Sequence, residues 1–126
     1  MRRRIRVLIA DDHPLVRRAL CMMLKSAPDV EIAALAADGD EAVRLVATVR
    51  PDVVVMDYRM PKMDGAEATR RIRDIDRHAT VLGLSSFAHE SGDEMRTAGA
   101  VACLDKRENL NDVVAAIQIA AALPHV

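Results

Sequence analysis

The sequence predicts a single α/β domain over residues 1–126, built as a doubly wound parallel sheet of the (βα)5 type in three α/β/α layers. Short apolar runs alternate with helical patterns along the whole chain, which is typical of parallel strands joined by crossover helices. The length of 126 residues is usual for one domain. A composition with 51% hydrophobic but only 2% aromatic residues predicts a core of Val, Ile, Leu, Ala and Met.

Five apolar runs have the length and the composition of β-strands. The third run is continuously apolar and mostly β-branched, which predicts a central strand buried on both faces. The predicted strands span residues 5–10, 30–36, 53–56, 81–84 and 101–104.

A helical segment follows each predicted strand, and turn or capping residues mark most of the helix ends. Ser91 and Glu94 have the spacing of a capping box, which predicts that a short fourth helix starts there and ends at Gly99. The other helices are expected between Pro14 and Pro28, between Asp38 and Pro51, over residues 66–75 and over residues 109–123, the last closed by Pro124.

Charge and composition exclude several classes of function. The formal net charge is −1, so bulk charge predicts no nucleic-acid binding by this chain. The arginines at residues 2–4 precede an apolar stretch too short for a secretory signal, and no apolar run reaches the roughly 18 residues of a membrane span. Cys21 and Cys103 lie far apart, so we expect reduced thiols in a cytoplasmic protein.

Polar side chains follow four of the predicted strands, close to the point where each strand ends. The acidic pair Asp11 and Asp12 follows the first strand. Asp57 follows the third strand, Ser85 the fourth and Lys106 the fifth. Because the carboxyl ends of parallel strands share one edge of a sheet, we expect these residues to meet in one pocket.

These residue types predict phosphoryl chemistry with bound Mg²⁺. The cation is usually held by one or two carboxylates together with water and phosphate oxygens. Asp11 and Asp12 would supply these carboxylates. Asp57 ends the most apolar strand, where a carboxylate is costly unless it is used, and carboxylates do act as nucleophiles toward phosphorus. Lys106 would neutralise the phosphoryl oxygens, and Ser85 would donate a hydrogen bond to one of them. The competing interpretation is structural: the acidic pair caps the next helix, and the lysine is an ordinary surface residue.

Four stretches of the chain resemble a known family. They are Val-Leu-Ile-Ala-Asp-Asp-His (7–13), Val-Val-Val-Met-Asp-Tyr-Arg-Met-Pro-Lys-Met-Asp-Gly (53–65), Leu-Ser-Ser (84–86), and Ala-Gly-Ala (98–100) followed by Asp-Lys (105–106). Through these motifs the chain resembles, along its whole length, the response-regulator receiver domain of two-component signalling, which has a flavodoxin-like fold. The sequences Asp-Asp-His-Pro and Asp-Tyr-Arg-Met-Pro are similar to those of NarL/FixJ-type receivers in LuxR-family regulators.

The resemblance implies a role for each candidate site residue. Asp57 would accept a phosphoryl group from a histidine kinase, Lys106 would pair with that group, and Ser85 would be the switch hydroxyl that moves in afterwards. The implied ligands of Mg²⁺ are Asp11, Asp12, Asp57 and the backbone carbonyl of Arg59. The domain would then be a phosphoacceptor switch rather than an enzyme, and it would control an output domain or partner in transcription regulation.

Two positions depart from the family pattern. Receivers usually carry Tyr or Phe as a second switch residue, and the matching position here is Cys103, whose side chain cannot swap between buried and exposed positions as a ring does. We therefore expect a weaker or rerouted coupling to the switch hydroxyl. Phe87 offers nothing to orient an attacking water, so we expect a comparatively long-lived phosphoryl group.

The last predicted helix is almost wholly apolar, with Gln118 as its only polar residue over 113–123. A helix that is apolar all round is normally covered on more than one side, and the sheet covers only one. We expect a homodimer or inter-domain contact through Val113, Ile117 and Ile119, the alternative being that exposed alanines are harmless helix formers.

NarL/FixJ-type regulators usually continue from the receiver into a helix-turn-helix DNA-binding domain. This chain contains no such segment, so it is either a stand-alone receiver or the receiver portion of a longer regulator. In both cases we expect no DNA binding by these residues alone.

Two other classes of function fit parts of the pattern. A Mg²⁺-dependent phosphatase or phosphotransferase would also form an aspartyl phosphate, but it would need an acid two residues after the nucleophile, where this chain has Arg59. A nucleotide-binding module would need a Gly-rich phosphate loop after the first strand, where this chain has acidic residues. The four histidines, His13 included, are scattered, and we treat them as surface residues without a metal role.

Overall fold

A computed structural model describes residues 3–86 and 88–123, in which the five predicted strands form one parallel sheet. The strands are β1 (Ile5–Ala10), β2 (Val30–Ala36), β3 (Val53–Asp57), β4 (Thr80–Ser85) and β5 (Ala102–Asp105). Their order across the sheet is β2-β1-β3-β4-β5, so β3 is central. This arrangement confirms the predicted fold class.

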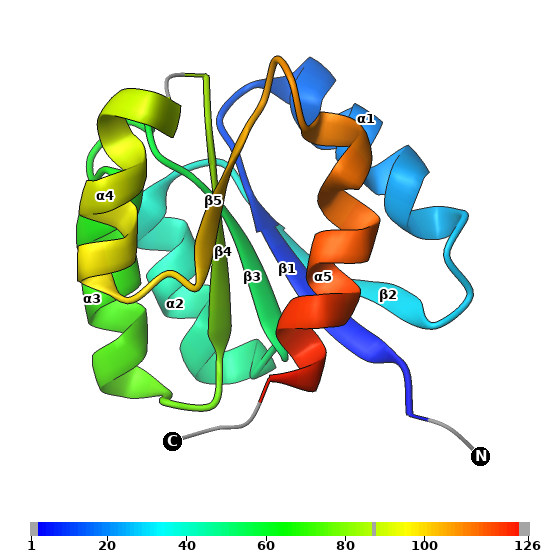
Figure 1. Cartoon of the computed structure of the whole chain (residues 1–126). Helices are drawn as coiled ribbons and strands as arrows, with labels where there is room; N and C mark the ends of the chain where they lie inside the picture. The colour runs from blue at the N-terminus through cyan, green and yellow to red at the C-terminus, as the bar shows by residue number, and fades with distance from the viewer. Residues whose placement is uncertain (1–2, 87, 124–126) are drawn as a thin grey trace.

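Helices cover both faces of the sheet, as Figure 1 shows, with α1 and α5 on one face and α2, α3 and α4 on the other. They are α1 (Pro14–Lys25), α2 (Gly39–Val49), α3 (Gly65–Ile75), α4 (Ala88–Ala98) and α5 (Val113–Ala122), the last preceded by a short 3-10 turn, η1 (Leu110–Asp112). None of the helices that the structure describes combines the length and the apolar character that a bilayer crossing requires.

The alternation of side chains along β3 divides the interior into two apolar clusters. Val54 and Met56 face α2, α3 and α4, where they pack with Ile72 and other buried residues. Val53 and Val55 face α1 and α5 in the second cluster. Since β3 is buried on both faces, the carboxylate at its end is held by a rigid, fully packed strand.

The predicted start of the fourth helix is wrong. α4 begins at Ala88, so Ser91 lies inside the helix rather than at its N-cap, and the helix has 11 residues, the same length as α2 and α3. The physical reason is a tertiary contact, because Ser91 is buried and its Oγ lies 2.8 Å from Ser85 Oγ. A buried hydroxyl with such a partner outweighs a local capping pattern.

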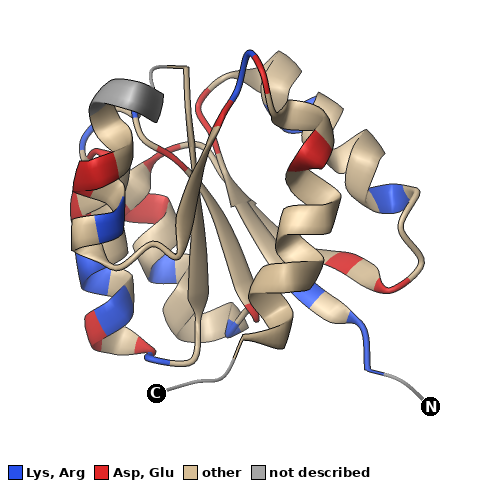
Figure 2. Cartoon of the chain, viewed as in Figure 1, with Lys and Arg blue, Asp and Glu red and all other residues tan. Residues whose placement is uncertain are grey.

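The expected contact surface on the last helix also needs correction. Val113 and Ile117 are fully buried against the sheet, so these two residues cannot form an interface with another molecule. Ile119 is 66% exposed and lies on the outer side of α5. Figure 2 shows α5 almost without charge, whereas α3 carries alternating acidic and basic bands.

Candidate functional site

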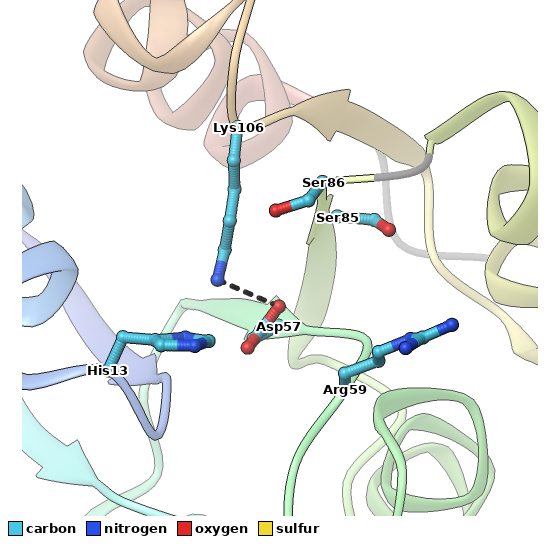
Figure 3. A pocket seen from close by; sticks show the side chains of 6 residues that line it. All are labelled: His13, Asp57, Arg59, Ser85, Ser86 and Lys106. Atoms are coloured by element: carbon cyan, nitrogen blue, oxygen red, sulfur yellow. Dashed lines mark ion pairs between the residues drawn. The ribbon is translucent and has the colours of Figure 1, made fainter.

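A pocket of about 190 Å³ lies where the carboxyl ends of the strands meet. Figure 3 shows Asp57 in its centre, with Lys106 reaching in from the loop after β5. The lining side chains are His13, Asp57, Arg59, Ser85, Ser86 and Lys106. Asp57 on β3 and Lys106 in the loop after β5 are 49 positions apart in the sequence, and the parallel sheet brings them into contact.

Backbone hydrogen bonds hold these loops in place. The N–H of Lys106 donates to the carbonyl of Ser85 at 2.9 Å, which continues the β4–β5 ladder beyond β5. Similarly, the N–H of Tyr58 donates to the carbonyl of Leu84 at 2.8 Å. The segments after β3, β4 and β5 are therefore fixed to one another at the backbone level.

Asp57 is buried and paired with a lysine. Its residue exposure is 2%, and Asp57 Oδ1 lies 3.0 Å from Lys106 Nζ. The same Nζ lies 2.6 Å from Asp11 Oδ2, so one ammonium bridges two carboxylates. Asp57 Oδ2, by contrast, has no hydrogen-bond partner among the described residues. The free carboxylate oxygen lies in a pocket large enough for a small group.

The environment of Asp57 favours its neutral form. Burial, followed by repulsion from the charge of Asp11, raises the pKa of Asp57 to about 6, and the attraction of Lys106 opposes this rise only in part. Removing a carboxylate from water disfavours its charged form, and a second carboxylate nearby does the same. A cation or an electrophile that neutralised this site would therefore be bound favourably.

Asp11 and Asp12 both contribute to an acidic cluster beside Asp57, together with a residue that the sequence did not suggest. Asp11 is fully buried, and its Oδ1 accepts a 2.8 Å hydrogen bond from the backbone N–H of His13. His13 Nδ1 lies 3.2 Å from Asp11 Oδ1 and 3.2 Å from Asp12 Oδ1. His13 is exposed, as predicted, but its imidazole also lies within the acidic cluster. The signal in the sequence was its place directly after the acidic pair.

The acidic cluster has the donors that a divalent cation requires. Asp11, Asp12, His13 and Asp57 each offer one ligand atom, and these atoms all lie within 4.8 Å of one another. Two of the carboxylate oxygens, Asp12 Oδ1 and Asp57 Oδ2, are buried atoms without a hydrogen-bond partner among the described residues. Because a buried carboxylate oxygen is costly to leave unpaired, the residues present fit a bound Mg²⁺.

The two adjacent serines at the end of β4 lie differently. Ser85 is buried, and its hydroxyl is bonded to Ser91 on α4, so in Figure 3 it points away from Asp57. Ser86, which the sequence did not single out, also lines the pocket and has its hydroxyl on the Lys106 side. Arg59 lines the same pocket two residues after Asp57.

Cys103 lies on β5, two strands away from the phosphoacceptor candidate on β3, and packs against the cluster beneath α4. It is partly buried, and this burial raises the pKa of its thiol. Cys103 is therefore a small packing residue at the position that the family resemblance predicts for the second switch residue. Phe87, on which the expected phosphoryl lifetime depends, lies outside the described residues.

The response regulator receiver domain model matches residues 7–118, so the chain belongs to this family. The transcriptional regulatory protein LiaR of Bacillus subtilis is 38% identical over 117 residues, which cover 92% of this chain and 56% of LiaR. A protein-glutamate methylesterase/protein-glutamine glutaminase of Syntrophus aciditrophicus is 39% identical over 107 residues, 81% of this chain and 30% of that protein. The chain thus spans about half, or less, of the curated relatives that it matches.

Solved structures agree with this assignment. The receiver domain of the response regulator NarL from Mycobacterium tuberculosis has a TM-score of 0.89 and 31% identity, covering 95% of this chain and 98% of that chain. The receiver domain of the sensor histidine kinase PA1611 from Pseudomonas aeruginosa has a TM-score of 0.85 and 28% identity, with 95% and 99% covered, and holds a magnesium ion in its active-site cleft. The predicted similarity to NarL-type receivers is confirmed.

Proposed function

We propose that this domain is a phosphorylation-dependent switch, in which Asp57 accepts a phosphoryl group from a histidine kinase. The observation that carries the proposal is the state of the Asp57 carboxylate: it is buried, one oxygen is paired with Lys106, and the other faces the pocket unpaired. A structural carboxylate would have both oxygens satisfied.

The residues present support a complete transfer step. One carboxylate oxygen of Asp57 forms a bond to phosphorus while the bond from phosphorus to the donor imidazole nitrogen breaks, and the imidazole leaves with the electron pair and takes a proton from solvent. Lys106 remains paired with the charge that builds up on the phosphoryl oxygens. Asp11, Asp12, Asp57 and the backbone carbonyl of Arg59 would hold Mg²⁺. When bound, this cation neutralises phosphoryl charge.

The switch would act through Ser85. In the structure its hydroxyl is bonded to Ser91 Oγ, so donating to a phosphoryl oxygen on Asp57 requires it to exchange that 2.8 Å contact. Ser91 belongs to α4 and is buried. Phosphorylation would thus change the contact between the end of β4 and α4. This mechanism does not need an aromatic side chain at position 103.

The output is proposed from the relatives. LiaR is a transcriptional regulatory protein, so we propose that this receiver controls transcription through an output domain or partner, in the cytoplasm, and does not itself bind DNA. The receiver would be a phosphoacceptor and not an enzyme with an external substrate. The methylesterase relative makes control of an attached enzyme the second candidate output.

Self-association is proposed as the means of output, through the outer side of α5 together with α1. Ile119 on α5 is exposed, as are Leu15 and Met22 on α1. Figure 1 shows the two helices side by side on the same face of the sheet. Exposed apolar side chains on neighbouring helices favour a contact between two copies of the chain.

Intact mass spectrometry after incubation with acetyl phosphate and Mg²⁺ tests the proposed function. Wild type should gain about 80 Da, one phosphoryl group, whereas Asp57→Ala should gain nothing. Removal of Mg²⁺ by a chelator should abolish the gain. A wild-type protein that binds Mg²⁺ but takes up no phosphoryl group would contradict the proposal.

A further inference from the structure

The imidazole of His13 is oriented by the acidic cluster and not by the helix that it precedes. His13 occupies the N-cap position of α1, but its side chain makes no capping hydrogen bond. Its Nδ1 instead lies at the same distance, 3.2 Å, from an oxygen of Asp11 and an oxygen of Asp12. The side chain is 61% exposed, so packing does not force the ring into this position.

A hydrogen bond explains only half of this arrangement. The contact with Asp11 Oδ1 has hydrogen-bond geometry, whereas Asp12 Oδ1 has no hydrogen-bond partner among the described residues although Nδ1 is equally near. Asp11 Oδ1 is also already held by the backbone N–H of His13. One ring nitrogen therefore faces two carboxylate oxygens, and only one of the two contacts is satisfied by a proton.

Ligands of one cation have this spacing. Two ligands at right angles, each about 2.1 Å from a cation, are about 3 Å apart. The 3.2 Å separations of Nδ1 from both oxygens match that value closely. The ammonium of Lys106 pairs with Asp11 Oδ2 and Asp57 Oδ1. It does not contact Asp11 Oδ1, Asp12 Oδ1 or Asp57 Oδ2, so these three oxygens are left for a cation.

We propose that His13 Nδ1 is a further protein ligand of the divalent cation in this pocket, which makes the site a mixed nitrogen and oxygen site. The proposal rests on the proposed function only in that the acidic pocket binds a divalent cation. The ring would be neutral, with its proton on Nε2 and the lone pair of Nδ1 directed at the metal.

The consequence is a changed metal preference. Mg²⁺ prefers oxygen ligands and gains little from an imidazole, whereas Mn²⁺, Co²⁺ and Ni²⁺ accept imidazole nitrogen with rising affinity in that order. The site should therefore bind Ni²⁺ and Mn²⁺ more tightly relative to Mg²⁺ than it would with oxygen donors alone.

Pulsed electron paramagnetic resonance of Mn²⁺ bound to the full chain tests for the ligand directly. Wild type should show the ¹⁴N coupling of a coordinated imidazole, and His13→Ala should lose it while still binding Mn²⁺ through its carboxylates. His78→Ala is the matched control, because His78 is an exposed residue just before β4, at the opposite end of the sheet, and should keep the coupling.

Calorimetric titration of each protein with Mg²⁺ and Ni²⁺ separates ligation from a merely structural role. In His13→Ala the affinity for Ni²⁺ should fall by about tenfold or more, while that for Mg²⁺ should change by less than about threefold. His13→Gln should behave as His13→Ala, since an amide keeps a polar group of similar reach but lacks the imidazole nitrogen.

Two results would overturn the proposal: Mn²⁺ bound to wild type without ¹⁴N coupling, or equal losses of Ni²⁺ and Mg²⁺ affinity in His13→Ala. Either result leaves phosphorylation of Asp57 untouched. A wild-type protein that binds neither Mn²⁺ nor Mg²⁺ would refute the metal site itself and, with it, the proposed function.

Discussion

At the residue scale, the charge of Asp57 opposes folding. Its pKa in the folded protein, about 6, is above the ordinary value of 3.8, so the folded state holds this proton more tightly than the unfolded chain does. Stability associated with this group is therefore fully present below about pH 4 and is lost as the pH rises toward 6. At neutral pH the folded protein carries the whole penalty of the buried charge.

We therefore expect Asp57→Asn to be more stable than wild type at pH 7 without divalent cations, by up to about 3 kcal/mol. Urea unfolding in the presence of a chelator measures this difference. The advantage of the variant should shrink as the pH is lowered to about 4, where the wild-type carboxyl is protonated in the folded state. A variant less stable than wild type at pH 7 would show that the carboxylate stabilises the fold.

Gly65 is required at the start of α3 because the helix begins against the backbone of Asp57. A Cβ at this position would overlap the backbone carbonyl oxygen of Asp57 and approach Tyr58 Cα to 2.9 Å. Gly65→Ala must therefore displace the backbone that carries Asp57. We expect a loss of about 1–3 kcal/mol in unfolding free energy and little or no phosphorylation by acetyl phosphate.

Gly92→Ala is the control for that substitution. Gly92 lies inside α4, where the nearest atoms to an added Cβ belong to the flexible end of Arg96, the closest at 3.2 Å. Alanine in a helix interior should stabilise the fold by about 0.5–1 kcal/mol. Equal effects of the two alanine substitutions on phosphorylation would contradict a specific role for Gly65.

At the scale of elements, the side chain of Tyr58 ties α4 to the loop after β3. The Tyr58 hydroxyl, directly after Asp57 in sequence, donates a 2.6 Å hydrogen bond to Glu94 Oε2 on α4. This hydrogen bond, then burial, raises the pKa of Tyr58 from 10.0 to about 12. A shift of the loop after β3 would therefore act on α4 directly, in addition to the contact between Ser85 and Ser91.

The titration of Tyr58 tests this tie. The chain has one tyrosine, so ultraviolet absorbance against pH reports this phenol alone. We expect a midpoint near 12 in wild type and a value closer to 10 in Glu94→Gln, which removes the charged acceptor. Asp93→Asn is the control, since Asp93 pairs with Arg96, and it should leave the midpoint unchanged. An ordinary midpoint in wild type would refute the contact.

The accuracy of the sequence-based predictions differed among elements for physical reasons. The five strands were predictable because buried parallel strands are continuous apolar runs, and the observed strand ends differ from the predicted ones by at most one residue. The start of α4 was not predictable, because Ser91 is held by a residue on another element. Likewise, the burial of Val113 and Ile117 depends on which side of α5 meets the sheet.

At the scale of the whole molecule, the meeting of Asp11, Asp57 and Lys106 followed from sequence because parallel strands share their carboxyl edge. Two members of the site did not follow. His13 was hidden by its isolation from the other histidines, since only the fold shows its ring against the two carboxylates. Ser86 was hidden because its direction relative to Ser85 depends on the turn after β4.

Self-association also belongs to this scale, and Ile119 is the residue that tests it. Ile119→Glu should leave folding intact, because the side chain is 66% exposed, and should abolish any dimer seen by sedimentation velocity after phosphorylation. Ile75→Glu places the same change on α3, across the sheet, where the side chain is 41% exposed, and should have no effect. A sedimentation profile that Ile119→Glu leaves unchanged would contradict the proposed surface.

The position of Lys106 on the last strand's loop has a consequence for synthesis of the chain. The ribosome releases Asp11, Asp12 and Asp57 long before the lysine that pairs with two of them, and β5, which positions it, is an edge strand joined only to β4. A nascent chain that ends before residue 106 would gather three carboxylates without the ammonium that pairs with Asp11 and Asp57. The segment that completes the sheet is thus also the one that brings in the lysine at its acidic edge. Folding of the domain therefore depends on its final fifth.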